Sequence, residues 1–220
     1  MSAPVTEHPQ LSRPQRFTQE RLGWVPWLAP PAQSELTEEQ IDALIQPQRA
    51  AMPYFRLLAR DPAALKARTL TDLDIFFNTD GGVGRAEREL AAAVTSRRNG
   101  CVFCASVHAA AATRESGRRD DVQRLLDDGV SADLGDERWN AVVAAADALA
   151  ETPLAFGDAE IARLRTAGFD DAEILDIISS AAFFHWANRL MLSLGEPEAP
   201  TRPVRDEPRR NDEQTTKENA

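Results

Sequence analysis

The segment RAERELAAAVTSRRNGCVFCASVHAAAA, residues 85–112, contains both cysteines of this 220-residue chain and one of its three histidines. Residues 84–98 are rich in alanine and place apolar side chains at helical spacing, which predicts a helix. An Asn-Gly pair then interrupts the pattern, and we expect a second helix to begin near Cys101 and to end at Gly117. The segment therefore predicts two consecutive helices, with both cysteines near the start of the second.

Three side chains with reactive chemistry share one face of that second helix. Cys104 follows Cys101 by three positions, and His108 follows Cys104 by four, so neighbouring members of the set lie about 5–6 Å apart on a helix. The first turn of a helix has unpaired N–H groups and a partial positive charge, and both favour thiolate over thiol. A histidine one turn later can accept the thiol proton. The spacing therefore predicts an activated nucleophile with a base beside it.

A catalytic base commonly has an orienting group, and the preceding helix offers two candidates, Glu87 and Glu89. They lie on different faces of that helix, so only one of them can point at the cysteine cluster. Helix geometry alone leaves the choice between them open.

The rest of the chain favours an all-α fold. A capping box formed by Thr37 and Gln40 starts a helical stretch, and a second helical stretch follows that is interrupted at Pro62. Further helices are expected at about residues 119–128, 136–151, 158–166 and 170–193, and no segment alternates like the strands of a β-rich protein. We therefore expect one helical domain over residues 35–197.

The two ends of the chain differ from the domain in composition and in hydrophobic pattern. Residues 1–34 are rich in proline and glutamine and predict an extended arm, in which Trp24 and Trp27 lie on an apolar surface of the same chain or of a neighbouring subunit. Residues 198–220 contain no large apolar side chain after Val204 and predict a disordered tail.

Composition excludes several classes of function. The chain has 25 basic and 35 acidic residues, a net charge of −10, which argues against a nucleic-acid-binding surface. No apolar run approaches the roughly 20 residues that a membrane span needs, and the N-terminus has no apolar signal region, so we expect no membrane partner and a cytoplasmic protein. In that compartment a disulfide is more often catalytic than structural.

The opening segment resembles the core motif of the carboxymuconolactone decarboxylase/alkylhydroperoxidase D-like superfamily, in which a glutamate is followed after eleven residues by CxxCxxxH. Counting back from Cys101, the resemblance selects Glu89 rather than Glu87. Residues 164–195 resemble the C-terminal part of the peroxidase-related branch, and the arm FTQERLGWVPWLAP looks like that of alkylhydroperoxidase-domain proteins in this branch. The resemblance implies an alkylhydroperoxidase D-like helical bundle that forms a homotrimer or homohexamer.

The resemblance also implies a thiol-dependent peroxidase that reduces organic hydroperoxides or hydrogen peroxide. In this hypothesis Glu89, directly or through a water, orients His108, and His108 draws the proton from Cys104. Cys104 attacks the hydroperoxide, and Cys101 closes the disulfide. A dithiol reductant or a redox adaptor protein would restore the dithiol. The lactone decarboxylase members lack the cysteine pair, so its presence argues against decarboxylation.

One departure keeps alternatives open, because well-studied alkylhydroperoxidase D proteins carry a second histidine where this chain has Val102 and Phe103. The alternatives are a thiol-disulfide oxidoreductase with little peroxidase activity and a non-catalytic oligomeric assembly protein. A zinc site at the cluster is disfavoured because no second CxxC or HxxxH occurs, and no glycine-rich phosphate loop follows a strand. We therefore predict neither a metal nor a cofactor. His185, Asn188 and Arg189 are expected to be structural.

Overall fold

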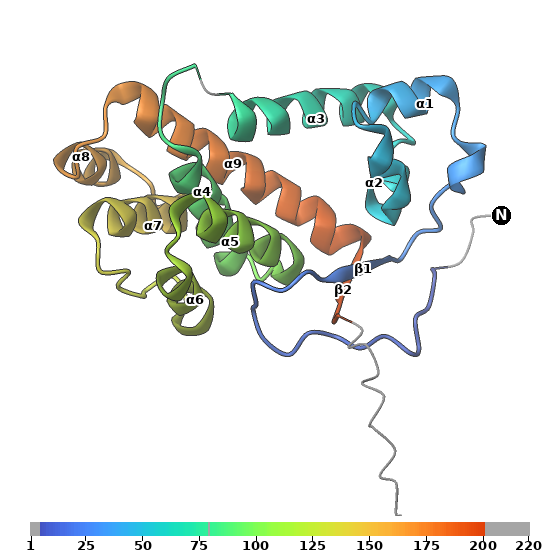
Figure 1. Ribbon diagram of the computed structural model, residues 1–220, viewed down its shortest axis with the longest axis horizontal. Helices are drawn as coiled ribbons and strands as arrows, with labels where there is room; N and C mark the ends of the chain where they lie inside the picture. The colour runs from blue at the N-terminus through green and yellow to red at the C-terminus, as the bar shows by residue number, and fades with distance from the viewer. Residues whose placement is uncertain (1–4, 79, 201–220) are drawn as a thin grey trace, which may run out of the picture.

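Helix α4 (Arg85–Arg98) lies at the centre of the computed structural model, which describes residues 5–78 and 80–200. It packs against α5 (Val102–Ser116), α7 (Glu137–Ala150) and the long helix α9 (Asp171–Leu194), which crosses the molecule (Figure 1). The other helices are α1 (Glu38–Ala43), α2 (Pro53–Leu58), α3 (Pro62–Phe77), α6 (Arg119–Asp128) and α8 (Asp158–Thr166), with 3-10 turns at Gln33–Glu35 and Pro47–Ala51. The all-α fold class is confirmed.

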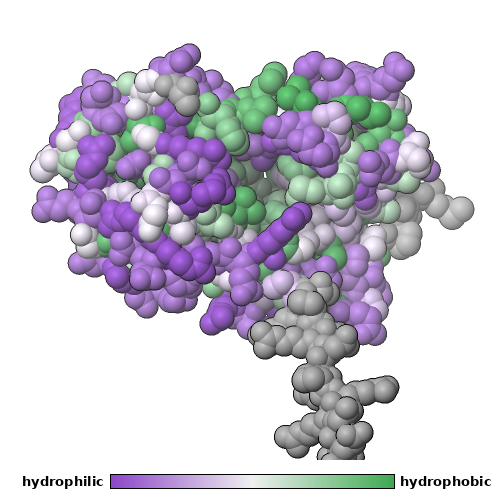
Figure 2. Space-filling model, in the orientation of Figure 1, coloured by the Kyte–Doolittle hydropathy of each residue, from purple (hydrophilic) through white to green (hydrophobic). Residues whose placement is uncertain are grey.

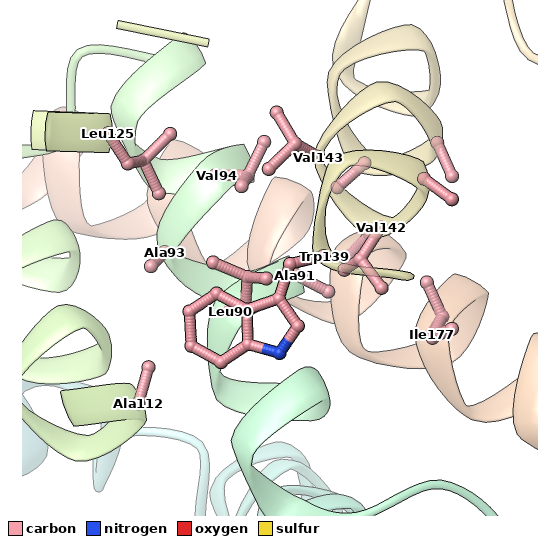
Figure 3. Close-up of a cluster of buried hydrophobic side chains, with 14 of the residues drawn as sticks. Leu90, Ala91, Ala93, Val94, Ala112, Leu125, Trp139, Val142, Val143 and Ile177 are labelled. Atoms are coloured by element: carbon pink, nitrogen blue, oxygen red, sulfur yellow. The ribbon is translucent and has the colours of Figure 1, made fainter. Parts of the chain in front are cut away.

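The alanine content of α4 has a packing reason. Every residue from position 88 to position 96 is buried, so this helix is covered on all sides rather than on one face. Small side chains let the neighbouring helices approach closely, and Leu90 and Val94 fill the space between them. Figure 3 shows these two residues packed with Trp139 of α7 and Ile177 of α9. This central position carries Glu89 into the interior.

The helix ends follow the local sequence signals. Thr37 Oγ1 accepts from the N–H of Gln40 at 3.3 Å, and Gln40 Oε1 accepts from the N–H of Thr37 at 3.0 Å, which is the predicted capping box. Pro62 occupies the first turn of α3, where its missing N–H has no cost, and Asp61 caps that helix. The helices expected in the second half of the chain begin and end within two residues of α6, α7, α8 and α9.

The N-terminal arm packs on its own chain. Strand β1 (Gly23–Pro26) pairs antiparallel with β2 (Gly195–Glu198), which follows α9 directly. Trp24 is buried, and its ring makes an edge-on contact with Tyr54 at a centroid distance of 5.5 Å. The sequence predicted a contact with an apolar surface of the same chain or of a neighbouring subunit, and in this single chain the arm pairs with its own C-terminal strand.

The predicted C-terminal boundary of the domain lies inside a strand. Strand β2 extends across the expected boundary at residue 197, so residue 198 pairs with the arm. The disordered tail predicted for residues 198–220 lies, from residue 201 onward, outside the described residues.

The surface has apolar regions as well as charged ones. Leu70 and Phe77 of α3 are exposed, and Figure 2 shows hydrophobic surface gathered along the edge of the molecule over this helix. Leu175 and Trp186 of α9 and Val107 of α5 are also exposed. Among the described residues, no helix has both the length and the apolar character needed to cross a membrane.

Candidate active site

The two cysteines lie where α4 gives way to α5. Asn99 ends α4, Gly100 adopts a φ of +74°, and Cys101 is the N-cap of α5. The left-handed conformation of Gly100 turns the chain sharply and carries little strain because glycine has no Cβ. Both cysteines are buried, both are free thiols, and they lie 3.2 Å apart. The sequence therefore forms a dithiol at the start of a helix, as its spacing predicted.

The two thiols differ in acidity. A hydrogen bond donated by the Cys104 thiol lowers the pKa of Cys101, against the opposing effect of burial. The same hydrogen bond, together with burial, raises the pKa of Cys104 well above its usual range. The sequence predicted that the helix start would favour thiolate at both positions, which is wrong for Cys104. Two sulfurs in contact disfavour two negative charges, and the directions of the two shifts favour Cys101 as the thiolate.

His108 is held by Glu89 from the side opposite the solvent. His108 Nδ1 lies 2.7 Å from Glu89 Oε2, and both side chains are buried. A carboxylate can only accept, so Nδ1 carries the proton and Nε2 presents its lone pair. The ring of Phe184 lies across the imidazole at a centroid distance of 3.8 Å and fixes its tilt. Of the two glutamates that helix geometry left open, Glu89 makes this contact, and it does so directly.

Arg85 was not identified from the sequence, yet it holds the same carboxylate. Its guanidinium donates to Glu89 Oε1 at 3.0 Å, one helical turn away on α4. It also lies 3.6 Å from Glu115 and above the ring of Phe77 at 4.1 Å. The signal that could have revealed it is the spacing of Arg85 and Glu89, which is that of an i, i+4 ion pair on a helix.

Asn188 lies beside the cysteines, whereas the sequence predicted only a structural role for it. Its side chain is fully buried, donates to Ser96 Oγ at 3.1 Å and accepts from Asn99 Nδ2 at 3.0 Å. Its amide also favours the thiolate of both cysteines: it contributes to the lowered pKa of Cys101 and opposes, without overcoming, the raised pKa of Cys104. Asn99 in turn lies 3.3 Å from His185 Nδ1. A polar chain therefore extends from α9 to the base of the dithiol.

A cavity of about 510 Å³ opens beside this cluster. Cys104 and His108 line it, whereas Cys101 does not, so Cys104 is the sulfur that a small molecule in the cavity would meet. The remaining wall comes from distant parts of the chain. It includes Trp24, Met52, Tyr54, Phe55, Arg49, Arg68, Asp72, Phe103, Phe184 and Met191. No pattern in the sequence indicated this wall.

The polar groups of the cluster are already engaged with one another. Glu89 binds His108 with one carboxylate oxygen and Arg85 with the other, so this glutamate does not face the two sulfurs as a metal ligand would. Within residues 5–78 and 80–200, no three His, Cys, Asp or Glu side chains are arranged to hold a metal ion.

The sequence model of the carboxymuconolactone decarboxylase family matches residues 62–148. This range extends from α3 to α7 and includes all four predicted site residues: Glu89, Cys101, Cys104 and His108. No curated protein matched the chain.

Solved structures share the fold. A peroxidase-related protein from Silicibacter sp. TM1040 is 25% identical, with 84% of this chain and 96% of that one covered and a TM-score of 0.65. The alkylhydroperoxidase AhpD core of a peroxidase-related protein from Ralstonia eutropha JMP134 is 24% identical, with 77% and 90% covered and a TM-score of 0.65. The debrominase Bmp8 in its apo form is 18% identical, with 74% and 87% covered and a TM-score of 0.59.

Proposed function

Because this chain belongs to the carboxymuconolactone decarboxylase/alkylhydroperoxidase D-like superfamily, we propose that it is a thiol-dependent peroxidase whose Cys101–Cys104 pair reduces hydroperoxides. A debrominase has the same fold, so the fold alone does not choose the reaction. The observation that carries the proposal is that Cys104 and His108 both line one cavity. Glu89 accepts a hydrogen bond from the imidazole of His108 and holds it in place.

The first step prepares the nucleophile. His108 Nε2 takes one proton from the dithiol, which leaves one negative charge on Cys101 and one S–H on Cys104, in accord with the opposite pKa shifts of the two thiols. As Cys104 attacks the outer peroxide oxygen, its proton passes across the short contact to Cys101. The O–O bond breaks, a sulfenic acid forms on Cys104, and the leaving alkoxide takes the proton that His108 holds.

The second step closes the disulfide. Cys101 attacks the sulfur of the sulfenic acid, the S–O bond breaks, and hydroxide leaves with the Cys101 proton as water. One hydroperoxide and two thiols thus become an alcohol, a water and a disulfide. An external dithiol, free or carried by a redox adaptor protein, returns the two electrons by thiol-disulfide exchange.

The experiment counts free thiols before and after one equivalent of cumene hydroperoxide. In the wild-type protein we expect two thiols to disappear and to return with dithiothreitol. In Cys101→Ser we expect a sulfenic acid at Cys104 that dimedone traps, and in Cys104→Ser no intramolecular disulfide and no turnover. If Cys104→Ser keeps full turnover and Cys101→Ser loses it, the roles are reversed. If both wild-type thiols survive the peroxide, the peroxidase proposal fails.

A second candidate is a thiol-disulfide oxidoreductase that reacts slowly with peroxide. The raised pKa of Cys104 favours it, because Cys104 is the thiol that lines the cavity, whereas the lowered pKa belongs to Cys101. The pair Val102 and Phe103, which stands where well-studied alkylhydroperoxidase D proteins carry a second histidine, favours it as well. Steady-state turnover with cumene hydroperoxide, compared with turnover of a small cyclic disulfide, separates the two enzymes. A non-catalytic assembly protein would turn over neither substrate.

A further inference from the structure

The cavity beside Cys104 has a cationic wall in an acidic protein. The chain has a net charge of −10, yet the charged residues that line the cavity apart from His108 are Arg21, Arg49, Arg68 and one acid, Asp72. An excess of arginine in a concave site of an acidic protein raises the local concentration of anions.

Two of these arginines share a single carboxylate oxygen. Arg68 Nη1 donates to Asp72 Oδ2 at 3.2 Å, and Arg49 Nη2 donates to the same atom at 3.5 Å. Their side chains are only 8% and 13% exposed, so water does little to screen the second positive charge. Both guanidinium groups lie over the ring of Phe55, at 4.8 Å for Arg49 and 5.5 Å for Arg68. One carboxylate therefore neutralises one of two buried cations.

One further nitrogen of each buried cation has no hydrogen-bond acceptor. Within the part of the chain that the structure describes, Arg49 Nη1, Arg68 Nε and the indole N–H of Trp24 are buried donors with no acceptor. All three side chains line the cavity. A buried donor without an acceptor is costly, and more so when it is charged. A ligand in the cavity that brings one negative charge would supply the missing countercharge beside these cations.

The apolar part of the cavity indicates what the rest of the ligand should be. Met52, Tyr54, Phe184 and Met191 give an apolar wall, and the volume of about 510 Å³ lies within the range of about 300–1,000 Å³ usual for small-molecule sites. The hydrogen bond with Cys101 and burial raise the pKa of Cys104, and the positive charge of Arg68 opposes that rise, so the arginine acts electrostatically on the thiol. A ligand with an anionic end, an apolar body and a reactive end at Cys104 matches these features.

We propose that the cavity binds organic hydroperoxides that carry a carboxylate, with Arg68 and Arg49 holding the carboxylate and the peroxide group against Cys104. The reduction is the one written above: the O–O bond breaks, the dithiol supplies two electrons, and the products are a hydroxy acid, water and the disulfide. The carboxylate is unchanged. The reaction rests on the proposed peroxidase function, whereas carboxylate binding does not.

Carboxylate binding is tested without turnover, by calorimetry on Cys104→Ser. The probes are decanoate and decanol, which share a chain and differ in charge. We expect decanoate to bind at least about tenfold more tightly. Adding Arg68→Gln should abolish that preference, and Arg68→Lys, which keeps the charge, should retain part of it. Arg165→Gln, which removes a charge from exposed α8, should leave the preference intact. Equal binding of the two probes to Cys104→Ser overturns the inference.

The substrate preference is tested on the wild-type protein with a fatty-acid hydroperoxide and its methyl ester. We expect kcat/KM to be at least about tenfold higher for the acid, and high salt to reduce the ratio. In Arg68→Gln the ratio should approach one. If the acid and the ester react equally well, the proposed peroxidase function is supported and the inference of carboxylate binding fails. If no hydroperoxide is reduced, the proposed function fails, and the calorimetry still decides whether the cavity binds carboxylates.

Discussion

At the scale of single residues, the contact between Glu89 and His108 fixes how the imidazole can act. Glu89→Gln keeps the shape of the side chain but removes its charge and can turn an N–H toward His108 Nδ1. We expect the ring to lose its fixed tautomer and orientation, and peroxide turnover to fall by about 10²-fold or more, the range typical of proton-transfer groups. Stopped-flow measurement of thiol oxidation by cumene hydroperoxide gives the rate.

Glu87→Gln is the matched control for that variant, because Glu87 lies on the same helix and the sequence pattern made it the other candidate. It is half-buried in the first turn of α4 and makes no contact with His108. Its turnover should match that of the wild-type protein. Similar losses in both variants would mean that the charge of α4, rather than the orientation of His108, controls the reaction. That result would remove Glu89 from the proposed relay.

The pKa of Cys101 gives a second prediction at this scale. A lowered pKa means that the thiolate persists at lower pH than for an ordinary cysteine, so ultraviolet thiolate absorbance should titrate with a midpoint below the usual value. The Cys104 thiol is the main cause. Cys104→Ala removes the donor and should raise the midpoint, while Cys104→Ser keeps a hydroxyl donor and should raise it less. Identical midpoints in the two variants would show that the contact with residue 104 does not set this acidity.

The sequence could predict the candidate reactive residues but not the difference in acidity between the two thiols. The spacing of Cys101, Cys104 and His108 follows from helix geometry, which is local. The opposite pKa shifts arise from the hydrogen bond between the two thiols, and burial by the surrounding helices opposes the lowering at Cys101 and adds to the rise at Cys104. Such effects depend on tertiary packing, so no local pattern could have indicated them.

At the scale of secondary-structure elements, two glycines in the left-handed region flank α5, Gly100 just before its N-cap and Gly117 at its C-cap. Gly100 and Gly117 both have a φ of +74°, and a Cβ at either position would meet nothing within 4 Å. Alanine at each position should therefore cost only the backbone conformation, about 1–2 kcal/mol in urea denaturation. Gly117→Ala is the control, since it lies far from the thiols. Gly100→Ala should also slow the reaction with peroxide, whereas Gly117→Ala should not.

If Gly117→Ala slows the reaction as much as Gly100→Ala does, the turn at residue 100 has no special role in placing the cysteines. If neither variant loses stability, the backbone strain argument is wrong.

The ends of the helices were predictable because they depend on near neighbours. Capping by Thr37, the break at Pro62 and the glycine at position 117 each act within a few residues. The strands were not predictable. Each has four residues, both contain proline, and they pair only because the arm returns to the end of α9. Pairing over such a distance leaves no periodic pattern in either segment.

At the scale of the whole molecule, the cavity joins parts that are far apart in the sequence. Trp24 of the arm, Arg49, Arg68 of α3 and Cys104 of α5 meet only after the domain has folded. Nothing in their local sequence connects the arginines with the thiols, and Trp24 was predicted only to lie on an apolar surface. The sequence therefore predicted a candidate nucleophile and left the wall of the cavity undetermined.

The assembly expected from the superfamily gives the last prediction. Trp186 of α9 is 46% exposed and packs beside Phe183, and large apolar side chains exposed in this way favour burial against another subunit. We propose a homotrimer or homohexamer and expect light scattering after gel filtration to give three or six times the mass of the chain. Trp186→Glu should shift that mass downward, because a charge buried in an interface without a partner is costly.

Leu154→Glu is the control, since Leu154 is 66% exposed outside any helix and its substitution should leave the mass unchanged. A wild-type protein that elutes with the mass of a single chain would contradict the prediction, and equal dissociation of both variants would show that Trp186 is not a specific contact.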